Sequence, residues 1–216
     1  MHVGILGGTG PAGRGLAVRL GVAGTEVTIG SRDATRGSAI AEELNGRWSG
    51  RGLSLAGGDN EAAAAADLVV VATPWDAAIP TVRPLADALA GKVVISVVVA
   101  LERQGKEMVA LTAPRGSMAA AVAAHAPGAK VAAAMHHLPA SEMENLEAGL
   151  AADVLVCSDD PAATEATIDL IASIEGLRPL DAGSLAQAGA VEAFTAVLIS
   201  LNIRYKAHST LRLGGL

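Results

Sequence analysis

A glycine-rich turn near the amino-terminal end constrains the fold of this chain more than any other feature. Residues 8–13 match the pattern G-x-G-x-x-G, follow a short apolar run at 3–6 and precede a stretch with helical spacing at 11–23. In such a strand-to-helix turn, the first glycine permits the tight turn, the second leaves room for a pyrophosphate, and the third lets the helix pack against the sheet. The alternative is a tight turn without a ligand. We predict a dinucleotide site formed by Gly8, Thr9, Gly10, Pro11, Ala12 and Gly13.

Apolar runs and helical stretches alternate along most of the chain. This alternation predicts an α/β fold of the Rossmann type, with a doubly wound parallel sheet and helices on both faces. The expected strands cover 3–6, 26–29, 53–55, 68–72, 93–99, 130–135, 154–156 and 177–180. The expected helices cover 11–23, 33–44, 60–66, 76–89, 117–125, 162–174 and 184–205, with Asp33 and Asn60 as amino-terminal caps.

The end of the second strand indicates which dinucleotide binds. An acidic residue at this place would bind the ribose hydroxyls of NAD, but this chain has Gly30-Ser31-Arg32. A hydroxyl followed by a guanidinium suits the 2′-phosphate of NADP, and Arg36 adds positive charge one turn into the next helix. Asp33 would favour NAD if the alignment shifted by two residues, but it also fits the cap of that helix. We therefore predict NADP(H).

A second strand end carries Thr73-Pro74-Trp75. Ligands of open α/β sheets lie beyond the carboxyl ends of the strands, so we expect these residues to border the nicotinamide ribose. The alternative for Trp75 is a surface or core aromatic unrelated to the ligand.

The length of the chain, 216 residues, suits one large and one small domain. We expect residues 1–150 to form the Rossmann domain that binds NADP, and residues 151–216 to form a smaller, mainly helical C-terminal domain. Strands of this second region are expected to extend the sheet. The apolar helix at 191–201 is expected to lie in the core or in a homodimer interface.

Charge and composition limit the partners. The formal net charge of −6 argues against nucleic-acid binding, which depends on Lys and Arg neutralising phosphates. Aromatic residues make up only 2% of the chain, so a bound ring must lie mostly against aliphatic groups and backbone. The single cysteine, Cys157, cannot form a disulfide within the chain, as is typical of proteins of the reducing cytoplasm. We expect Cys157 to be a buried residue of a strand. No basic and apolar leader precedes the first strand, and we expect neither a signal peptide nor a membrane span.

Five segments together resemble one known family. They are Gly7-Gly8-Thr9-Gly10, Gly30-Ser31-Arg32, Pro74-Trp75, His136 with Leu138-Pro139-Ala140, and the run 176–183. In order and spacing, over nearly the whole chain, they resemble the NADPH:coenzyme F-420 oxidoreductases, also called F-420-dependent NADP reductases. The glycine loop alone is generic, whereas the last two segments are much more specific.

The resemblance implies reversible hydride transfer between NADP(H) and the 5-deazaflavin coenzyme F-420, carried out by a homodimer. By this resemblance Thr9, Ser31 and Arg32 map to the phosphates of NADP. The deazaflavin pocket maps to the strand end 96–99, with Val97 and Val98, and to His136, His137, Leu138, Pro139 and Ala140. We expect the other face of the ring to meet aliphatic or backbone atoms of 136–140 or of the last helix near Thr195.

Two departures from the family pattern concern the acceptor. The fifth strand often ends in a proline-containing turn in this family, but here it reads Ser96-Val97-Val98-Val99-Ala100. Relatives often carry an arginine shortly after the Asp-Ala-Gly segment, where this chain has Gln187-Ala188-Gly189. The alternatives are therefore an NADPH-dependent reductase of a flavin, ferric iron, an imine or a keto acid, and a non-catalytic NADP(H) sensor.

The side chains available for chemistry are few. The sequence has no Cys/His metal cluster and no serine-nucleophile elbow, and hydride transfer between stacked rings needs neither. His136 is the candidate catalytic residue, which would orient the deazaflavin by a hydrogen bond or assist its proton balance. The alternative is that His136 and His137 only satisfy buried backbone groups.

Overall fold

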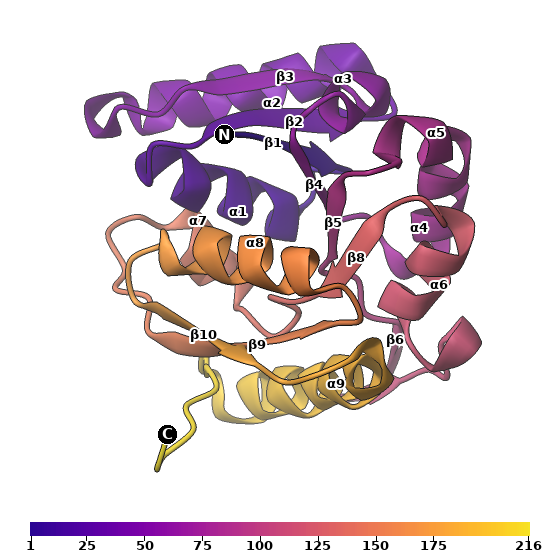
Figure 1. Ribbon diagram of the computed structural model, residues 1–216. Helices are drawn as coiled ribbons and strands as arrows, with labels where there is room; N and C mark the ends of the chain where they lie inside the picture. Colours follow the sequence, from indigo (N-terminus) through magenta and orange to yellow (C-terminus); the bar gives the residue numbers. More distant parts are fainter.

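The computed structural model of the chain describes residues 1–216 and is built on one eight-stranded sheet in the order β10-β9-β8-β5-β4-β1-β2-β3 (Figure 1). Neighbouring strands run parallel except for β8 and β9, which pair antiparallel. The predicted Rossmann-type, doubly wound α/β fold is confirmed. The reversed direction of the last two strands is a difference that the alternation of strands and helices did not indicate.

The strands of this sheet are short and mostly buried. They are β1 (His2–Leu6), β2 (Glu26–Ser31), β3 (Leu55–Asp59), β4 (Leu68–Val71), β5 (Val93–Ser96), β8 (Lys130–Ala133), β9 (Ala152–Ser158) and β10 (Leu177–Asp181). The helices are α1 (Pro11–Val22), α2 (Ala34–Arg47), α3 (Asn60–Ala64), α4 (Trp75–Val82), α5 (Ala86–Leu89), α6 (Met118–His125), α7 (Ala140–Glu144), α8 (Pro161–Ala172) and α9 (Ala188–Tyr205). Cys157 is buried on β9, as expected.

Helices cover both faces of the sheet and divide the core in two. On β4, Leu68 and Val70 pack into the cluster beneath α1, α2 and α8, while Val69 and Val71 pack into the cluster beneath α3, α4 and α6. This alternation follows from the pleat, which points successive side chains to opposite faces. Because both faces are covered, the carboxyl edge of the parallel strands remains the natural place for a ligand.

The third strand lies further along the chain than predicted. We expected it at 53–55, but β3 runs from Leu55 to Asp59 and contains Gly57 and Gly58. A Cβ at Gly57 would lie 2.2 Å from the carbonyl oxygen of Gly37 on α2. The glycines, which disfavour strands by propensity, are needed here because helix and strand approach to backbone contact.

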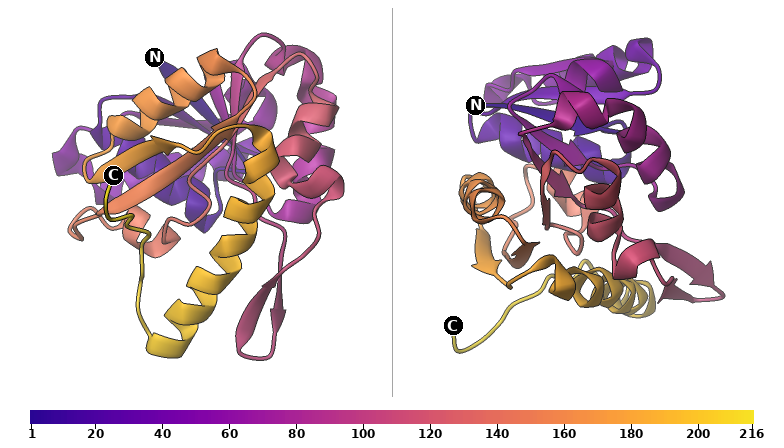
Figure 2. Two further views of the ribbon diagram at one scale, coloured as in Figure 1. Left: turned by 60° about the horizontal axis from the view of Figure 1, so that its bottom comes forward. Right: turned by 45° about the vertical axis from the view of Figure 1, so that its right-hand side comes forward.

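A hairpin and the last helix project together from the body of the molecule (Figure 2). The hairpin, β6 (Leu101–Gln104) and β7 (Glu107–Ala110), was not predicted. It contacts α9, where the backbone N–H of Met108 donates to Ser200 Oγ at 2.8 Å.

The stretch Leu185–Tyr205 is long and apolar enough, by length and composition alone, to cross a membrane. Of its most apolar 18 residues, 28% are buried within the protein. This is weak evidence for a span, because core helices pass the same test.

The C-terminal tail lies along β9. The guanidinium of Arg178 on β10 donates to both carboxylate oxygens of Asp153, at 2.8 and 2.6 Å, and to the carbonyl oxygen of Leu213 at 2.9 Å. The Asp153 carboxylate also accepts from the Leu213 N–H at 2.6 Å. These bonds hold the pKa of Asp153 well below its usual range, chiefly because of Arg178.

Candidate functional site

The three glycines of the amino-terminal turn are needed for different reasons. A Cβ at Gly13 would lie 2.5 Å from the Cα of Gly8, and a Cβ at Gly8 would lie 2.9 Å from the Ile5 carbonyl oxygen. The packing of the chain itself therefore requires both. A Cβ at Gly10 would meet only the Gly7 carbonyl oxygen, at 3.8 Å. Nothing in the fold requires a glycine at position 10, so its missing side chain keeps open space in front of the helix N-terminus.

That open space belongs to a cleft of about 430 Å³ at the carboxyl edge of the sheet. Its volume falls within the range of ligand pockets, about 300–1,000 Å³. The cleft brings together seven residues that the sequence predicted to bind a cofactor: Thr9, Gly10, Ser31, Arg32, Arg36, Thr73 and Pro74. It also contains residues that were not predicted: Gly7, Asn60, Ala72, Asp76, Ala77 and Thr81.

Two arginines, Arg32 just after β2 and Arg36 in the first turn of α2, line this cleft without an ion-pair partner. Neither Arg32 nor Arg36 takes part in an ion pair within the chain. Asp33 caps α2, where its carboxylate accepts from the Thr35 N–H at 2.9 Å. The acid is thus engaged as the predicted helix cap. Ser31 is buried beside it and accepts from the Asp33 N–H at 3.3 Å. Uncompensated guanidinium charge beside a hydroxyl is the chemistry that a phosphate monoester requires.

Asn60 has a different role from the one expected. We predicted it as the cap of α3, but Asp59 is the cap and accepts from the Ala62 N–H at 2.7 Å. Asn60 Oδ1 instead accepts from the Gly7 N–H at 3.1 Å and so ties the glycine loop to α3. Sequence reasoning missed this contact because it joins positions far apart in the chain.

The turn after β4 contributes only in part to the cleft. Thr73 and Pro74 line it, whereas Trp75 begins α4, is 40% exposed and is not among the lining residues. The hydroxyl of Thr73 is buried without a hydrogen-bond partner. An unpaired buried hydroxyl costs free energy, about 1–3 kcal/mol, unless a ligand satisfies it.

A small apolar pocket lies next to the glycine loop. Its volume is about 20 Å³, roughly enough for one water molecule. It joins the start of α1 to the segment after β8, and its lining residues are Ala12, Leu16, Val97, Met135, Leu138, Ala140 and Met143. Four of these, Ala12, Val97, Leu138 and Ala140, were predicted around the cofactors. Val98 points to the opposite core cluster.

His136 is the least satisfied polar side chain of this region. It is 7% exposed, and neither ring nitrogen has a hydrogen-bond partner. Burial lowers the pKa of His136 to about 3, helped by the neighbouring His137. The ring is therefore neutral at physiological pH. Met135, directly before it, has φ of 62°, a left-handed conformation that non-glycine residues rarely adopt and that is often found at functional sites.

The other residues that the sequence predicted around the deazaflavin differ in their hydrogen bonding and burial. His137 is buried and is held by the Asp153 carbonyl oxygen, so one of its nitrogens has a structural role. Pro139 precedes α7. Thr195 is buried on α9 with an unpartnered hydroxyl. One turn earlier, Glu192 accepts from the N–H groups of Met118 and Ala119, and burial raises its pKa.

The sheet order, the glycine loop and the cleft at the carboxyl edge define a Rossmann-type nucleotide-binding protein. Residues 2–100 match the model of the family described as NADP oxidoreductase, coenzyme F-420-dependent. The chain belongs to this F-420-dependent NADP oxidoreductase family, because its similarity to family members extends over nearly its full length.

Two of these relatives are F-420-dependent NADP reductases from archaea. The one from Methanocaldococcus jannaschii is 34% identical over 97% of this chain and 96% of the relative. The one from Methanothermobacter thermautotrophicus is 36% identical over 97% of this chain and 92% of the relative. The crystal structure of a protein from Arthrobacter sp. FB24, described as an F-420-dependent NADP reductase, superposes on this chain with a TM-score of 0.83. The two sequences are 26% identical, and the match covers 98% of both chains.

Proposed function

We propose that this protein transfers hydride reversibly between NADP(H) and the 5-deazaflavin coenzyme F-420. The observation that carries the proposal is the cleft, in which an open glycine turn, a buried hydroxyl and two unpaired arginines meet. The archaeal relatives that match the whole chain are reductases of this kind.

The residues of the cleft suit the pyrophosphate and the 2′-phosphate of NADP. The backbone at Thr9 and Gly10 and the N-terminus of α1 would receive the pyrophosphate. Ser31, Arg32 and Arg36 would receive the 2′-phosphate by charge-assisted hydrogen bonds. Thr73, whose hydroxyl lacks a partner, would bond a ribose or carboxamide oxygen.

The residues of the acceptor side suit an aromatic ring that the protein orients. The apolar pocket offers Val97, Leu138 and Ala140 as an aliphatic wall, in keeping with the scarcity of aromatic residues. His136 has free ring nitrogens and would bond a polar group of the deazaflavin. Because burial lowers its pKa to about 3, the ring is neutral at neutral pH and lacks the extra proton that an imidazolium acid would donate. The role of this side is therefore alignment.

The chemistry resides in the two coenzymes: NADPH gives up a hydride, the deazaflavin accepts it, and one proton comes from solvent. The protein contributes by holding donor and acceptor carbons at about 3–3.5 Å, where positioning lowers the barrier most. Thr9, Arg32 and Thr73 would fix one partner, and the segment 136–140 the other.

A turnover assay tests this proposal. The purified protein is mixed with coenzyme F-420 and NADPH, and the visible absorbance of the oxidised deazaflavin is followed. We expect bleaching with NADPH and far slower bleaching with NADH. Turnover of a flavin, ferric iron, an imine or a keto acid with an inert deazaflavin would replace the proposal by another reductase. NADPH binding without turnover of any acceptor would indicate a sensor.

We propose, in addition, an oligomeric state, a cellular location and a division into domains. Phe194, Val197, Leu201 and Tyr205 form an exposed stripe along α9, which we propose as the interface of a homodimer. A cytoplasmic location suits the unpaired Cys157. We also propose that residues 1–150 bind NADP and that 151–216 serve mainly assembly and the acceptor.

A further inference from the structure

The segment that follows β8 rests directly on the helix that follows the glycine loop. A Cβ at Gly15 on α1 would lie 2.6 Å from the Met143 Cβ and 3.0 Å from the Ala140 carbonyl oxygen on α7. The two helices therefore touch through backbone. Since Ala140 ends the predicted acceptor segment 136–140, the placement of that segment depends on α1.

One arginine of α1, Arg19, binds the stretch of chain just beyond this segment. The Arg19 guanidinium lies within hydrogen-bonding distance of four carbonyl oxygens that follow one another around α7 and beyond it. These are the oxygens of Glu142 at 2.8 Å, Met143 at 3.0 Å, Asn145 at 2.7 Å and Ala148 at 3.0 Å. The fixed fork of a guanidinium can donate to several carbonyl oxygens at once, a geometry that a lysine cannot reproduce.

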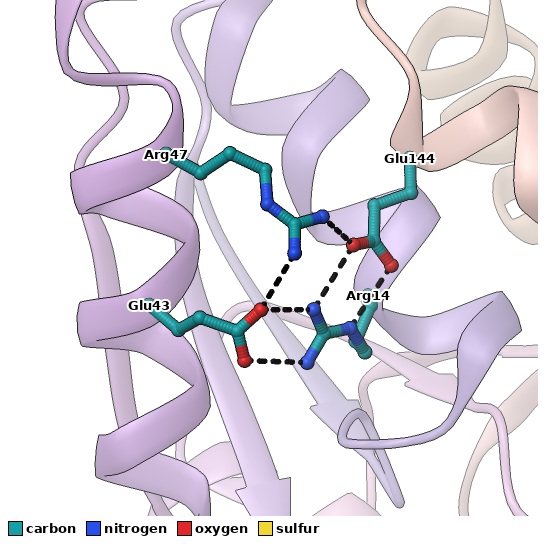
Figure 3. A network of polar contacts seen from close by, with 4 residues as sticks. All are labelled: Arg14, Glu43, Arg47 and Glu144. Atoms are coloured by element: carbon teal, nitrogen blue, oxygen red, sulfur yellow. Dashed lines mark hydrogen bonds and ion pairs between the residues drawn. The ribbon is translucent and has the colours of Figure 1, made fainter.

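A second arginine of α1 binds the end of α7 through a carboxylate. Arg14 donates from Nε and Nη2 to both oxygens of Glu144, each at 2.9 Å (Figure 3). It also donates to both oxygens of Glu43 on α2, at 3.0 and 2.6 Å, and Arg47 bridges the two carboxylates. Arg14 and Glu144 are largely buried, with side chains 15% and 19% exposed. Hydrogen bonds from Arg14 hold the pKa values of Glu43 and Glu144 below their usual range.

We propose that Arg14, Arg19 and Glu144 are positioning residues that set where the acceptor segment lies relative to the bound dinucleotide. The helix α1 begins at the pyrophosphate end of the cleft and carries both arginines, and Glu144 lies four residues beyond Ala140. This inference rests on the proposed function. None of the three residues lines the cleft or the apolar pocket, so they act through the segment and not on a ligand.

The chain contains its own control. Glu43 binds the same two arginines as Glu144, but it comes from α2, whereas Glu144 ends α7, the helix that begins at the last residue of the acceptor segment. Glu144→Gln and Glu43→Gln therefore remove the same charge from the same network. If the network only stabilises the fold, the two variants will behave alike; if it positions the acceptor, only Glu144→Gln will change the reaction.

The first measurement is the single-turnover rate of hydride transfer at saturating NADPH and deazaflavin, together with the Kd of NADPH. For Glu144→Gln we expect a rate about 10-fold lower, because displacement of an acceptor by a fraction of an ångström is costly, with the NADPH Kd unchanged. Glu43→Gln should leave both values unchanged. Equal rates for the two variants would overturn the proposal.

The second measurement does not depend on activity. Amide hydrogen exchange of the peptide 139–148 should quicken about 10-fold in Glu144→Gln and in Arg19→Lys, while β4 exchanges as in the wild type. Glu43→Gln should leave the peptide protected. If the wild type fails to reduce the deazaflavin, the proposed function fails, and exchange alone decides whether these residues hold the segment. Unchanged exchange in both Glu144→Gln and Arg19→Lys would refute the anchoring.

Discussion

His137 Nε2 donates a hydrogen bond to the carbonyl oxygen of Asp153 at 2.8 Å, which fixes its tautomer and ties the acceptor segment to β9. His136, the next residue back, has no such partner on either nitrogen. The two adjacent histidines therefore differ in degree: Nε2 of His137 is held by the fold and only its Nδ1 lacks a partner, whereas both ring nitrogens of His136 lack one. Because both of its ring nitrogens are unpartnered, His136 is the histidine that we expect to contact a ligand.

The first prediction concerns turnover by a His136→Ala variant. If His136 only orients the deazaflavin, kcat should fall modestly and less than the roughly 100- to 10,000-fold that loss of a general acid or base produces. The measurement is steady-state turnover beside deazaflavin binding by fluorescence. A fall within that larger range, with binding intact, would show that His136 transfers a proton.

The second prediction concerns stability below neutral pH. Burial lowers the pKa of His136 from 6.5 to about 3, so the unfolded chain binds a proton that the folded chain excludes. This destabilisation is absent above pH 6.5. As the pH drops from 6.5 toward 3, the free energy of unfolding should fall by up to about 1.4 kcal/mol per pH unit. Denaturant unfolding at several pH values should show a shallower slope for His136→Asn. Identical slopes would mean that the pKa of His136 is the same in the folded and the unfolded protein.

The third prediction concerns the choice of dinucleotide. Arg32→Ala should weaken NADPH binding about 10- to 100-fold, because a charge-assisted hydrogen bond contributes roughly 1.5–3 kcal/mol. NADH, which lacks the 2′-phosphate, should bind almost as before. Isothermal titration with both coenzymes gives the ratio. Equal loss of both would remove Arg32 from the 2′-phosphate site.

The fourth prediction separates the glycine that faces the cleft from one that faces solvent. Gly10→Val should fold normally and lose NADPH, because its side chain would extend into the space in front of α1. Gly46→Val on α2 is the matched control, since a Cβ there meets nothing within 4 Å. Circular dichroism and NADPH titration check both variants. A Gly10→Val protein that binds NADPH normally would place the pyrophosphate elsewhere.

The fifth prediction concerns assembly. Val197 is 51% exposed in the middle of the apolar stripe on α9, and a charge there should disrupt the proposed homodimer. Light scattering should report a dimer for the wild type and a monomer for Val197→Glu. The control is Val22→Glu at the end of α1, which is 43% exposed and lies outside the stripe. A wild type that is monomeric at micromolar concentration would refute the proposal.

The sequence predicted most of the sheet, and it predicted residues that meet in the cleft, because those signals are local. The strand, the glycine turn and the helix are contiguous, and Ser31 and Arg32 follow β2 directly. The position of β3 was wrong because Gly57 is required by close approach to Gly37, a contact between elements. The hairpin β6–β7 was missed because charged and polar residues interrupt the apolar pattern that would have indicated strands.

The acceptor side was harder to predict because its supports are distant in the chain. Arg14 and Glu144 are separated by 130 positions, and nothing in the local pattern of either marks the pair. His136 was found only through the resemblance of its segment to a family. Its lack of partners is a property of the packed structure.

The most direct test of the central claim is to follow the hydride itself. The protein is given NADPH carrying deuterium at the transferable position of the nicotinamide, together with coenzyme F-420, in ordinary water. If donor and acceptor are held in contact, mass spectrometry should find the deuterium on the ring of the reduced deazaflavin. Reduced deazaflavin without deuterium, or no reduction while another acceptor is turned over, would contradict the account.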